Sequence, residues 1–291
     1  MSFADRITIG IPAFNESRHI GDALASASGQ SRHIIVSDNG SDDGTAEICS
    51  KSAVTNADIQ LFRHTDNRGS TFNFKFLLDQ CRTEYFMWLG AHDRIPRNYT
   101  STLIAILDDH PEAVMAYGDS IRIDPNGNPV HTEKHAMLKQ HLESVKRAER
   151  MQAIVKYLTD CSLIHGVWRA EVLRRAWVEG KYLGVDHVIL LNASAIGPLR
   201  HTASTNLLRR NPRRSDSHAL QLQRMAGRES RKSPTYTEMY LRQLRIVYST
   251  LGIGACLTAT INILGRLGAF NLKSYLRLLG ISGKRSQESS Q

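Results

Sequence analysis

Apolar and polar positions alternate along the first 120 residues with the rhythm of repeated β-α units. Short apolar runs predict buried strands over residues 7–13, 33–37, 59–64, 85–90 and 114–117. Apolar residues at helical spacing fill the intervals and predict helices over 16–28, 43–53, 70–81 and 98–109. Strands that alternate with helices form right-handed βαβ crossovers, so the sequence predicts an α/β fold with a mostly parallel central sheet flanked by helices.

The pattern changes at the turn DPNGNP, residues 124–129, which is typical of a hairpin. Beyond it, the spacing predicts helices over 144–158, 170–176 and 185–196 and a strand over 162–168. A polar stretch over 216–233 precedes a last part of helical character. We therefore expect a main domain over residues 1–215 and a basic helical C-terminal extension over 216–291.

The net charge of +9 comes from the end of the chain. Residues 200–291 contain 16 Lys and Arg against 4 Asp and Glu, which suits an anionic partner. We expect peripheral contact with an anionic membrane and no nucleic-acid partner, because no recognition motif is present and aromatic residues do not interleave the basic ones. Four scattered cysteines without a CxxC pair and a start without a signal-peptide pattern predict a cytoplasmic protein, on the inner face of the cytoplasmic membrane if it is peripheral.

One uncharged segment, residues 246–264, bears on the membrane question. It lies between Arg245 and Arg266 and approaches the length of a membrane span, but it contains Ser, Thr, Asn and Gly. Three interpretations stay open: a helix packed on the domain or in a homodimer interface, an interfacial helix held on anionic lipid by the two arginines, and a true span. The first is favoured, since the segment is polar for a span.

Candidate ligand-binding side chains follow the predicted strands. In an open parallel sheet, ligands bind at the carboxyl ends of the strands, which share one edge. The side chains at these ends are Pro12, Phe14, Asn15 and Glu16, then Asp38, Asn39 and Gly40, then Asn67, Arg68 and Gly69, and finally His92 and Asp93. Asp38 can accept hydrogen bonds from a base or ribose, and Asp93 can hold a hard divalent cation. Taken singly, such residues are more often turn or cap residues than ligands.

These segments together resemble a known family. ITIGIPAFNE, IIVSDNGSDDGT, RHTDNRG and EYFMWLGAHDRIP, in this order and spacing, closely resemble the nucleotide-binding half of family 2 glycosyltransferases, which have the GT-A fold. The resemblance implies a nucleotide-binding half over residues 1–120, with Pro12, Phe14, Asn15 and Glu16 lining the nucleotide pocket. It further implies that Asp38 recognises the base, usually uracil, that Arg68 lies near the diphosphate, and that Asp93 holds Mn²⁺ or Mg²⁺.

The sequence departs from the family pattern at the metal site. Where the family usually has an acidic cluster, this chain has Gly90, Ala91, His92 and Asp93, so one carboxylate is left. Imidazole is a suitable ligand for transition metals, so we interpret His92 as a second metal ligand and expect Mn²⁺ to be preferred over Mg²⁺. The alternative is that His92 contacts ribose or phosphate.

The second half resembles the family more loosely and supplies the acceptor half, residues 121–215. In LIHGVWRAEVLRRA and GVDHVILLNASAIG, the family pattern places an acidic residue at the start of an apolar helix, and Asp186 stands there. The resemblance implies that Asp186 is the general base that deprotonates the acceptor hydroxyl. The alternative is an acid that stabilises the first turn of the helix. Trp168 is a candidate for stacking on an acceptor sugar.

An arginine cluster in LLRRNPRRSDS follows a strand-like run. Guanidinium groups bind two phosphate oxygens at once, so Arg210 and Arg213, with Arg209 and Arg214 beside them, are candidates for gripping the donor diphosphate. The alternative is a solvated basic loop or a lipid contact.

The combined prediction is an inverting glycosyltransferase that moves a sugar from a nucleotide-diphosphate donor, a UDP-sugar, to a hydroxyl of a glycan or lipid-linked glycan. Two alternatives remain. The eroded acidic cluster would suit a non-catalytic protein that binds nucleotide or glycan. A sugar-phosphate nucleotidyltransferase is disfavoured, because IPAFNE lacks the glycine-rich, Lys-containing loop that such enzymes need.

Overall fold

A computed structural model describes residues 2–133, 136–180, 182–210 and 236–278 of the chain. Its strands are β1 (Ile7–Ala13), β2 (His33–Asp38), β3 (Ile59–Arg63), β4 (Tyr85–Trp88), β5 (Met115–Ile123), β6 (Pro129–Glu133), β7 (Val167–Arg169) and β8 (Leu199–Arg210). The helices of the first half are η1 (Phe3–Asp5), α1 (Ile20–Ala27), α2 (Thr45–Thr55), α3 (Ser70–Gln80) and α4 (Tyr99–Asp109). Those of the second half are α5 (Ala136–Leu142), α6 (Arg147–Tyr157), η2 (Ser162–His165), α7 (Ala170–Ala176), α8 (Val185–Ile196), α10 (Thr237–Leu251) and α11 (Ile253–Leu278).

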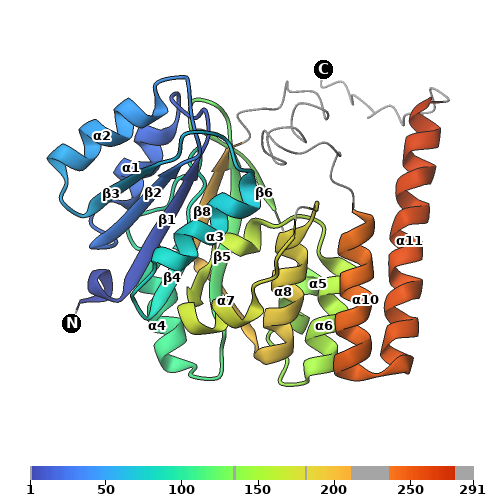
Figure 1. Cartoon of the computed structure of the whole chain (residues 1–291). Helices are drawn as coiled ribbons and strands as arrows, with labels where there is room; N and C mark the ends of the chain where they lie inside the picture. Colours follow the sequence, from blue (N-terminus) through green and yellow to red (C-terminus); the bar gives the residue numbers. More distant parts are fainter. Residues whose placement is uncertain (1, 134–135, 181, 211–235, 279–291) are drawn as a thin grey trace, which may run out of the picture.

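The sheet is mixed and mostly parallel, as the alternation of strands and helices predicts. Its order is β3-β2-β1-β4-β7-β5-β6, and β8 pairs with β5. β1 to β4 are parallel to one another, and β8 is parallel to β5. β7 is antiparallel to both β4 and β5, and β6 is antiparallel to β5 across the DPNGNP turn. The predicted hairpin is therefore present (Figure 1).

The middle strands are buried on both faces because their sequences are continuously apolar. Along β4, Tyr85 and Met87 join one core cluster, whereas Phe86 and Trp88 join the cluster on the other face. This is the pattern expected of a parallel strand that helices cover on both sides. The carboxyl ends of β1, β2, β3 and β4 consequently meet at one edge of the sheet, from which the polar loops emerge.

Three predicted elements differ from the structure. Residues 162–168 form the 3-10 helix η2 followed by the three-residue β7, not one strand. α1 begins at Ile20 rather than at residue 16, because the preceding segment is a loop whose backbone contacts the loop after β2. β5 extends to Ile123, six residues beyond the predicted end at residue 117, because β8 and β6 pair with its second half.

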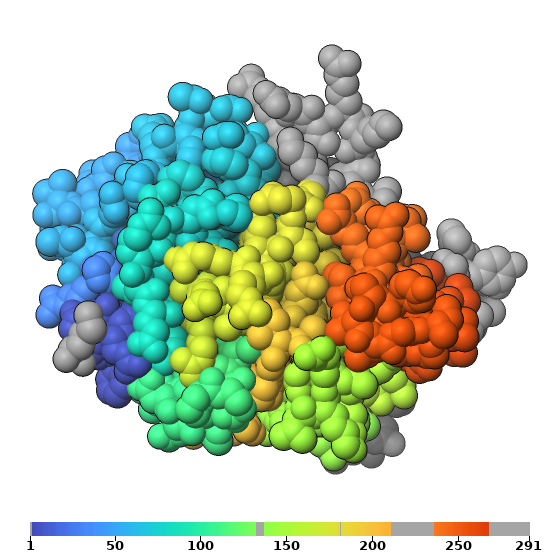
Figure 2. Space-filling model, turned by 60° about the horizontal axis from the view of Figure 1, so that its bottom comes forward, coloured from blue at the N-terminus to red at the C-terminus, as the bar shows by residue number. Residues whose placement is uncertain are grey.

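The segment 246–264 is divided between two helices. Gly252, with φ +85°, ends α10 and allows the chain to reverse into α11. Within the described part of the chain, no helix has the length and apolar character needed to cross a bilayer. α10 packs on α8, and α11 packs on α6 and α10, so these helices form one end of the molecule while α1 and α2 lie at the other (Figures 1 and 2).

Candidate active site

The loop after β1 contacts both the loop after β2 and the loop after β4. The backbone N–H of Asn15 donates to Ser41 Oγ over 2.9 Å, and Ser41 Oγ donates to Asp38 Oδ1. On the other side, Glu16 Oε1 lies 3.0 Å from His92 Nδ1. A continuous series of contacts thus joins Asp38 to the loop that carries His92 and Asp93, and the predicted donor-site residues from β1, β2 and β4 lie together.

Asp38 is a buried carboxylate, and one of its two oxygens accepts no hydrogen bond. Its exposed fraction is 0%, and Oδ2 has no hydrogen-bond partner, while Arg63 Nε lies 3.8 Å from it. Burial raises the pKa of Asp38, and the hydrogen bond from Ser41 opposes this shift. A buried acceptor without a donor is costly, so Oδ2 is suited to an N–H that a ligand brings.

Asn15 fixes the shape of the loop after β1 beside the loop after β2. It has φ +54°, a left-handed conformation that asparagine tolerates better than most residues. Its side chain is fixed at both ends, since Nδ2 donates to Asp42 Oδ1 and Oδ1 accepts from the backbone N–H of Asp42. Pro12 and Phe14 precede this turn and are half-buried. The loop therefore presents a defined surface beside Asp38.

The loop after β3 packs closely on the loop after β2. Asn39 Nδ2 donates to Asn67 Oδ1 over 2.9 Å, and Asn39 Oδ1 accepts from the backbone N–H of Arg68. A Cβ on Gly40 would lie 2.6 Å from the backbone of Asp66, so only glycine fits there. The Arg68 guanidinium is exposed and lies 3.7 Å from the centre of the Phe72 ring. Arg68 is thus held at the rim of this edge.

His92 and Asp93 are arranged as a pair of metal ligands would be. Asp93 is 2% exposed, and its Oδ1 lies 3.9 Å from His92 Nε2. Glu16 faces Nδ1, which leaves Nε2 on the side of Asp93. A carboxylate that orients a histidine through its second ring nitrogen is the usual outer-shell partner of a metal-binding histidine. The donor set of one carboxylate and one imidazole fits a divalent ion whose remaining ligands are phosphate oxygens and water.

Arg210 holds in place the loop after β4 that carries His92 and Asp93, which we call the metal-site loop. Its backbone N–H donates to Asp93 Oδ1 over 2.9 Å, and Nη1 donates to the carbonyl of His92 over 3.1 Å. Nη2 pairs with Asp22 at 3.1 Å, and the side chain is 1% exposed. The guanidinium thus points into the protein, which gives Arg210 a positioning role that the sequence did not indicate; its contact with the diphosphate stays a prediction. Arg213 lies outside the described residues.

Arg209 faces the other side of β8, since successive residues of a strand point in opposite directions. Its Nη1 lies 3.3 Å from Asp160 Oδ1, and its charge acts on His165, whose pKa burial lowers. Asp93 also acts on His165. Arg209 therefore lies between the metal-site loop and the acceptor half. The sequence pattern did not predict a strand over residues 199–210 and therefore grouped Arg209 with Arg210. Had this strand been recognised, the alternation of side chains along it would have placed the two arginines on opposite faces.

Asp186 lies in the first turn of α8 beside a thiol and an imidazole. Its Oδ1 accepts from the backbone N–H of His187 over 3.0 Å. Ligand atoms of Cys161, Asp186 and His187 lie within 4.8 Å of one another, the one such group of three among the residues that the structure describes. Burial and the neighbouring Asp186 raise the pKa of Cys161 well above the usual range, and burial lowers that of His187. The protonated Cys161 thiol therefore hydrogen-bonds to Asp186, and the buried imidazole of His187 lies beside the same carboxylate.

The position of η2 was not predicted from the sequence. Cys161 precedes this 3-10 helix and interacts with Asp186, whereas His165 is its last residue and interacts with Asp93, so η2 lies between the two carboxylates. The isolated Cys and His of CSLIHG carry no motif that would have signalled this. Trp168, the candidate for stacking on an acceptor sugar, offers no surface for this: it is 0% exposed and donates to the carbonyl of Ile164 over 2.9 Å, because β7 is an inner strand.

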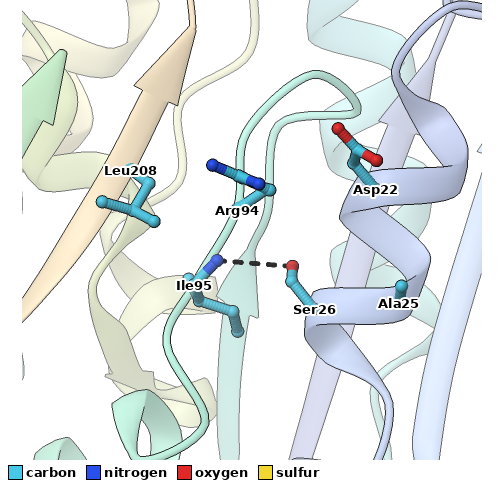
Figure 3. Close-up of a pocket in the computed structure, with 6 residues that line it drawn as sticks. All are labelled: Asp22, Ala25, Ser26, Arg94, Ile95 and Leu208. Carbon is cyan, nitrogen blue, oxygen red and sulfur yellow. Dashed lines mark hydrogen bonds between the residues drawn. The ribbon is translucent and has the colours of Figure 1, made fainter. Parts of the chain in front are cut away.

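A shallow depression of about 360 Å³ lies behind the metal-site loop. Figure 3 shows Asp22 and Ser26 of α1 facing Arg94 and Ile95 of the loop after β4, with Ser26 Oγ accepting from the N–H of Ile95. Asp22 is also the partner of Arg210. The depression therefore borders the support of Asp93, and it is lined by none of the predicted donor-site residues.

Comparisons with solved structures bear out the fold. TarS 1–349 of S. aureus is 14% identical, with a TM-score of 0.64 over 98% of this chain and 76% of that chain. Its complex with UDP-GlcNAc gives 13% identity, a TM-score of 0.66 and coverage of 98% and 77%. The mannosyltransferase PcManGT from Pyrobaculum calidifontis, in complex with GDP-Man and Mn²⁺, is 16% identical, with a TM-score of 0.55 over 95% of this chain and 81% of that chain.

A comparison with the sequence profiles of protein families assigns more than half of the chain. No curated protein matches this sequence. Residues 8–178, however, match the profile described as Glycosyl transferase family 2, and this range includes the loops after β1, β2, β3 and β4. The chain therefore belongs to glycosyl transferase family 2, and it is a glycosyltransferase with a GT-A-type fold.

Proposed function

We propose that this protein is an inverting glycosyltransferase that moves a sugar from a nucleotide-diphosphate donor, a UDP-sugar, to a hydroxyl of a glycan or lipid-linked glycan. The observation that carries the proposal is the series of contacts from Asp38 through Asn15 and Glu16 to His92 and Asp93. It joins a buried acceptor for a base N–H to a carboxylate–imidazole pair suited to a cation. The named complexes of TarS with UDP-GlcNAc and of PcManGT with GDP-Man support a nucleotide-sugar donor.

Each end of the donor has its own residues. Asp38 Oδ2 accepts from the base N–H, and Phe14 and Asn15 form the adjoining surface. Arg68 and Arg209 supply positive charge toward the diphosphate, with Arg210 and Arg213 as the further candidates. Asp93 and His92 would hold Mn²⁺, in preference to Mg²⁺, and the ion when bound would neutralise charge on the leaving diphosphate. The named complex of PcManGT with Mn²⁺ supports a divalent cofactor.

Asp186 is the proposed base. Its carboxylate accepts the proton of the acceptor hydroxyl as the hydroxyl oxygen attacks the anomeric carbon, and the bond to the diphosphate breaks in the same displacement. The reaction inverts the anomeric centre and needs no covalent intermediate. The Cys161 thiol and the backbone N–H of His187 hydrogen-bond to this carboxylate and orient it.

The test compares Asp186→Asn with wild type. Transfer from UDP-sugars is expected to fall about 10²- to 10⁴-fold, the usual contribution of a general base. Stabilisation by UDP, measured as the shift of the melting temperature, should stay the same. Glu238→Gln, an exposed change on α10, is the control and should leave both readouts unchanged. Near-normal turnover of Asp186→Asn would assign the base elsewhere.

A second candidate is a non-catalytic protein that binds a nucleotide sugar, because the metal site has one carboxylate where the family usually has a cluster. A screen of UDP- and GDP-sugars with and without Mn²⁺ separates the two. A transferase releases nucleotide when donor and acceptor are both present, and slowly by hydrolysis without acceptor. A binding protein shows the shift of the melting temperature alone.

A further inference from the structure

α11 has apolar side chains on two opposite sides. The inner side carries Ala255, Ala259 and Ile263, spaced four residues apart, and packs on the core; Ala259 is 0% and Ile263 5% exposed. Arg266 continues this inner side, since its guanidinium donates to the carbonyls of Val155 and Leu158 at the end of α6. The inner side alone accounts for the attachment of α11 to the molecule.

On the outer side, the residues that the structure describes leave the apolar side chains exposed. Ile253, Leu257, Ile261 and Leu264 follow at intervals of four, four and three residues, so they form one stripe along the helix. We call these four residues the outer stripe. Their exposed fractions are 64%, 58%, 69% and 61%, and the neighbouring Leu267 is 37% exposed. Contiguous exposed apolar side chains of this size mark an interaction surface, whereas isolated ones do not.

The charge of the helix selects the partner. Residues 253–278 contain Arg266, Lys273 and Arg277 and no acidic residue. Arg245, in the middle of the preceding helix α10, is exposed. Two copies of such a surface would bring like charges together, whereas an anionic surface would be attracted. Arg266 itself is turned inward, so the attraction to an anionic surface does not depend on the two arginines that bracket the uncharged segment.

We propose that the outer stripe of α11 binds an anionic lipid surface, with the helix lying in the plane of the membrane interface. A helix with an apolar stripe, basic residues and too few apolar residues to span is typical of this mode. α11 is the outermost helix at its end of the molecule, so the stripe can reach a flat surface (Figure 1). This inference concerns attachment and holds whichever sugar is transferred.

The experiment measures sedimentation of the full chain with vesicles of phosphatidylcholine alone or mixed with phosphatidylglycerol. The wild type should bind the mixed vesicles, and binding should weaken with added salt. In Leu257→Glu with Ile261→Glu, the partition coefficient should fall at least about tenfold, because two apolar side chains are replaced by charges that the lipid repels. Val54→Glu with Val145→Glu is the matched control, since both valines are 87% exposed and lie away from α11, on α2 and in the loop between α5 and α6.

Folding is checked independently, because a charged pair on a helix can disturb it. Leu257→Ser with Ile261→Ser removes the apolar contact without adding charge and should weaken binding in the same direction. All variants should keep the melting temperature and the response to UDP of the wild type. A wild type that ignores the mixed vesicles, or a Glu pair that binds them equally well, would overturn the proposal. So would a dimer in sedimentation equilibrium that the Glu pair dissociates, since the stripe would then bind a second copy.

Discussion

Asp38, the proposed acceptor for a base N–H, has an environment that is unfavourable in the protein without a ligand. Its Oδ2 is buried without a donor, and burial raises its pKa. An unsatisfied buried acceptor costs about 1–3 kcal/mol, which a ligand N–H recovers on binding. Sequence reasoning could find Asp38 because the DNG turn follows a strand, but it could not show that one oxygen is held by Ser41 and the other is not.

Asp38→Asn tests this directly. Asparagine directs an N–H toward the ligand N–H, so the affinity for UDP should fall about 10- to 100-fold, as measured by calorimetry. The free energy of unfolding at neutral pH should be equal or higher, because a buried charge is removed. Asp58→Asn, at the start of β3 and far from the site, should change neither; a variant of Asp38 with normal affinity would exclude its role in base recognition.

The pH dependence of UDP binding follows from the same shift. The folded protein holds the Asp38 proton more tightly than the unfolded chain does, so the contribution of this group to stability rises as the pH falls. Binding needs the ionised carboxylate and should weaken in the acid range, beginning above the usual pKa of about 4. The dissociation constant measured across this range should show a step that Asp38→Asn lacks.

Glu16 is expected to act on the metal through His92. Glu16→Ala removes the acceptor opposite His92 Nδ1, and the loss of such an outer-shell partner typically lowers metal affinity about 10- to 100-fold. Titration of Mn²⁺ in the presence of UDP, followed by electron paramagnetic resonance, measures this. UDP alone should still raise the melting temperature. Glu47→Ala, on the exposed side of α2, is the control. If both variants bound Mn²⁺ with equal affinity, Glu16 would have no role in metal binding.

At the scale of elements, the site depends on how closely its loops approach. The loops after β2 and β3 meet at Gly40, where no Cβ fits against the backbone of Asp66. A similar constraint holds at Gly90, where a Cβ would lie 2.5 Å from Asp93 Oδ2. Glycines near strand ends are visible in a sequence, but which of them touches another loop depends on the packing of the loops.

Gly40→Ala should open the contact between these loops. Its φ of +77° costs a side chain about 1–2 kcal/mol, and overpacking adds about 1–3 kcal/mol. Gly44→Ala is the matched control, because Gly44 has φ +91° but nothing within 4 Å of a Cβ. Urea unfolding should show the larger loss for Gly40→Ala, and this variant alone should lose affinity for UDP. If Gly40→Ala and Gly44→Ala lost equal amounts of stability, the contact between the two loops would not be important for the fold.

The first half was more predictable than the second for a physical reason. In residues 7–109, local periodicity decides the elements, and strand and helix limits agree with the structure within a few residues. Among the later elements, β7 and β8 owe their form to partners distant in the chain: β7 is inserted between β4 and β5, and β8 follows β5. The same distance hid the inward turn of Arg210, whose partners Asp22 and Asp93 lie more than 100 residues away.

At the scale of the whole molecule, the C-terminal helices share a core with the sheet. Val247, Ala259 and Ile263 belong to the same cluster as Trp88 and Trp168. The division at residue 215 predicted from composition remains a prediction about the chain, but the described parts on its two sides are packed together. The helices should therefore unfold together with the main domain rather than before it.

Ile263→Ala and Leu264→Ala form a neighbouring pair that tests this. Ile263 is 5% exposed, so its truncation should lower the free energy of unfolding by about 2–5 kcal/mol. Leu264 is 61% exposed, and its truncation should change the value by less than about 0.5 kcal/mol. Tryptophan fluorescence and far-ultraviolet circular dichroism should report one transition in both variants. A separate early transition in Ile263→Ala would show that the helices are an independent unit.

The pairing of β8 with β5 also sets an order of events during synthesis. Asp93 emerges from the ribosome early, but the backbone N–H that fixes its carboxylate belongs to Arg210, more than 100 residues later. Contacts between such distant parts of a chain form slowly, because a long loop must close first. The loops after β1, β2 and β3 therefore emerge well before the contact that fixes Asp93, the proposed cation ligand, can form. On this proposal, docking of β8 on β5 completes the cation position last.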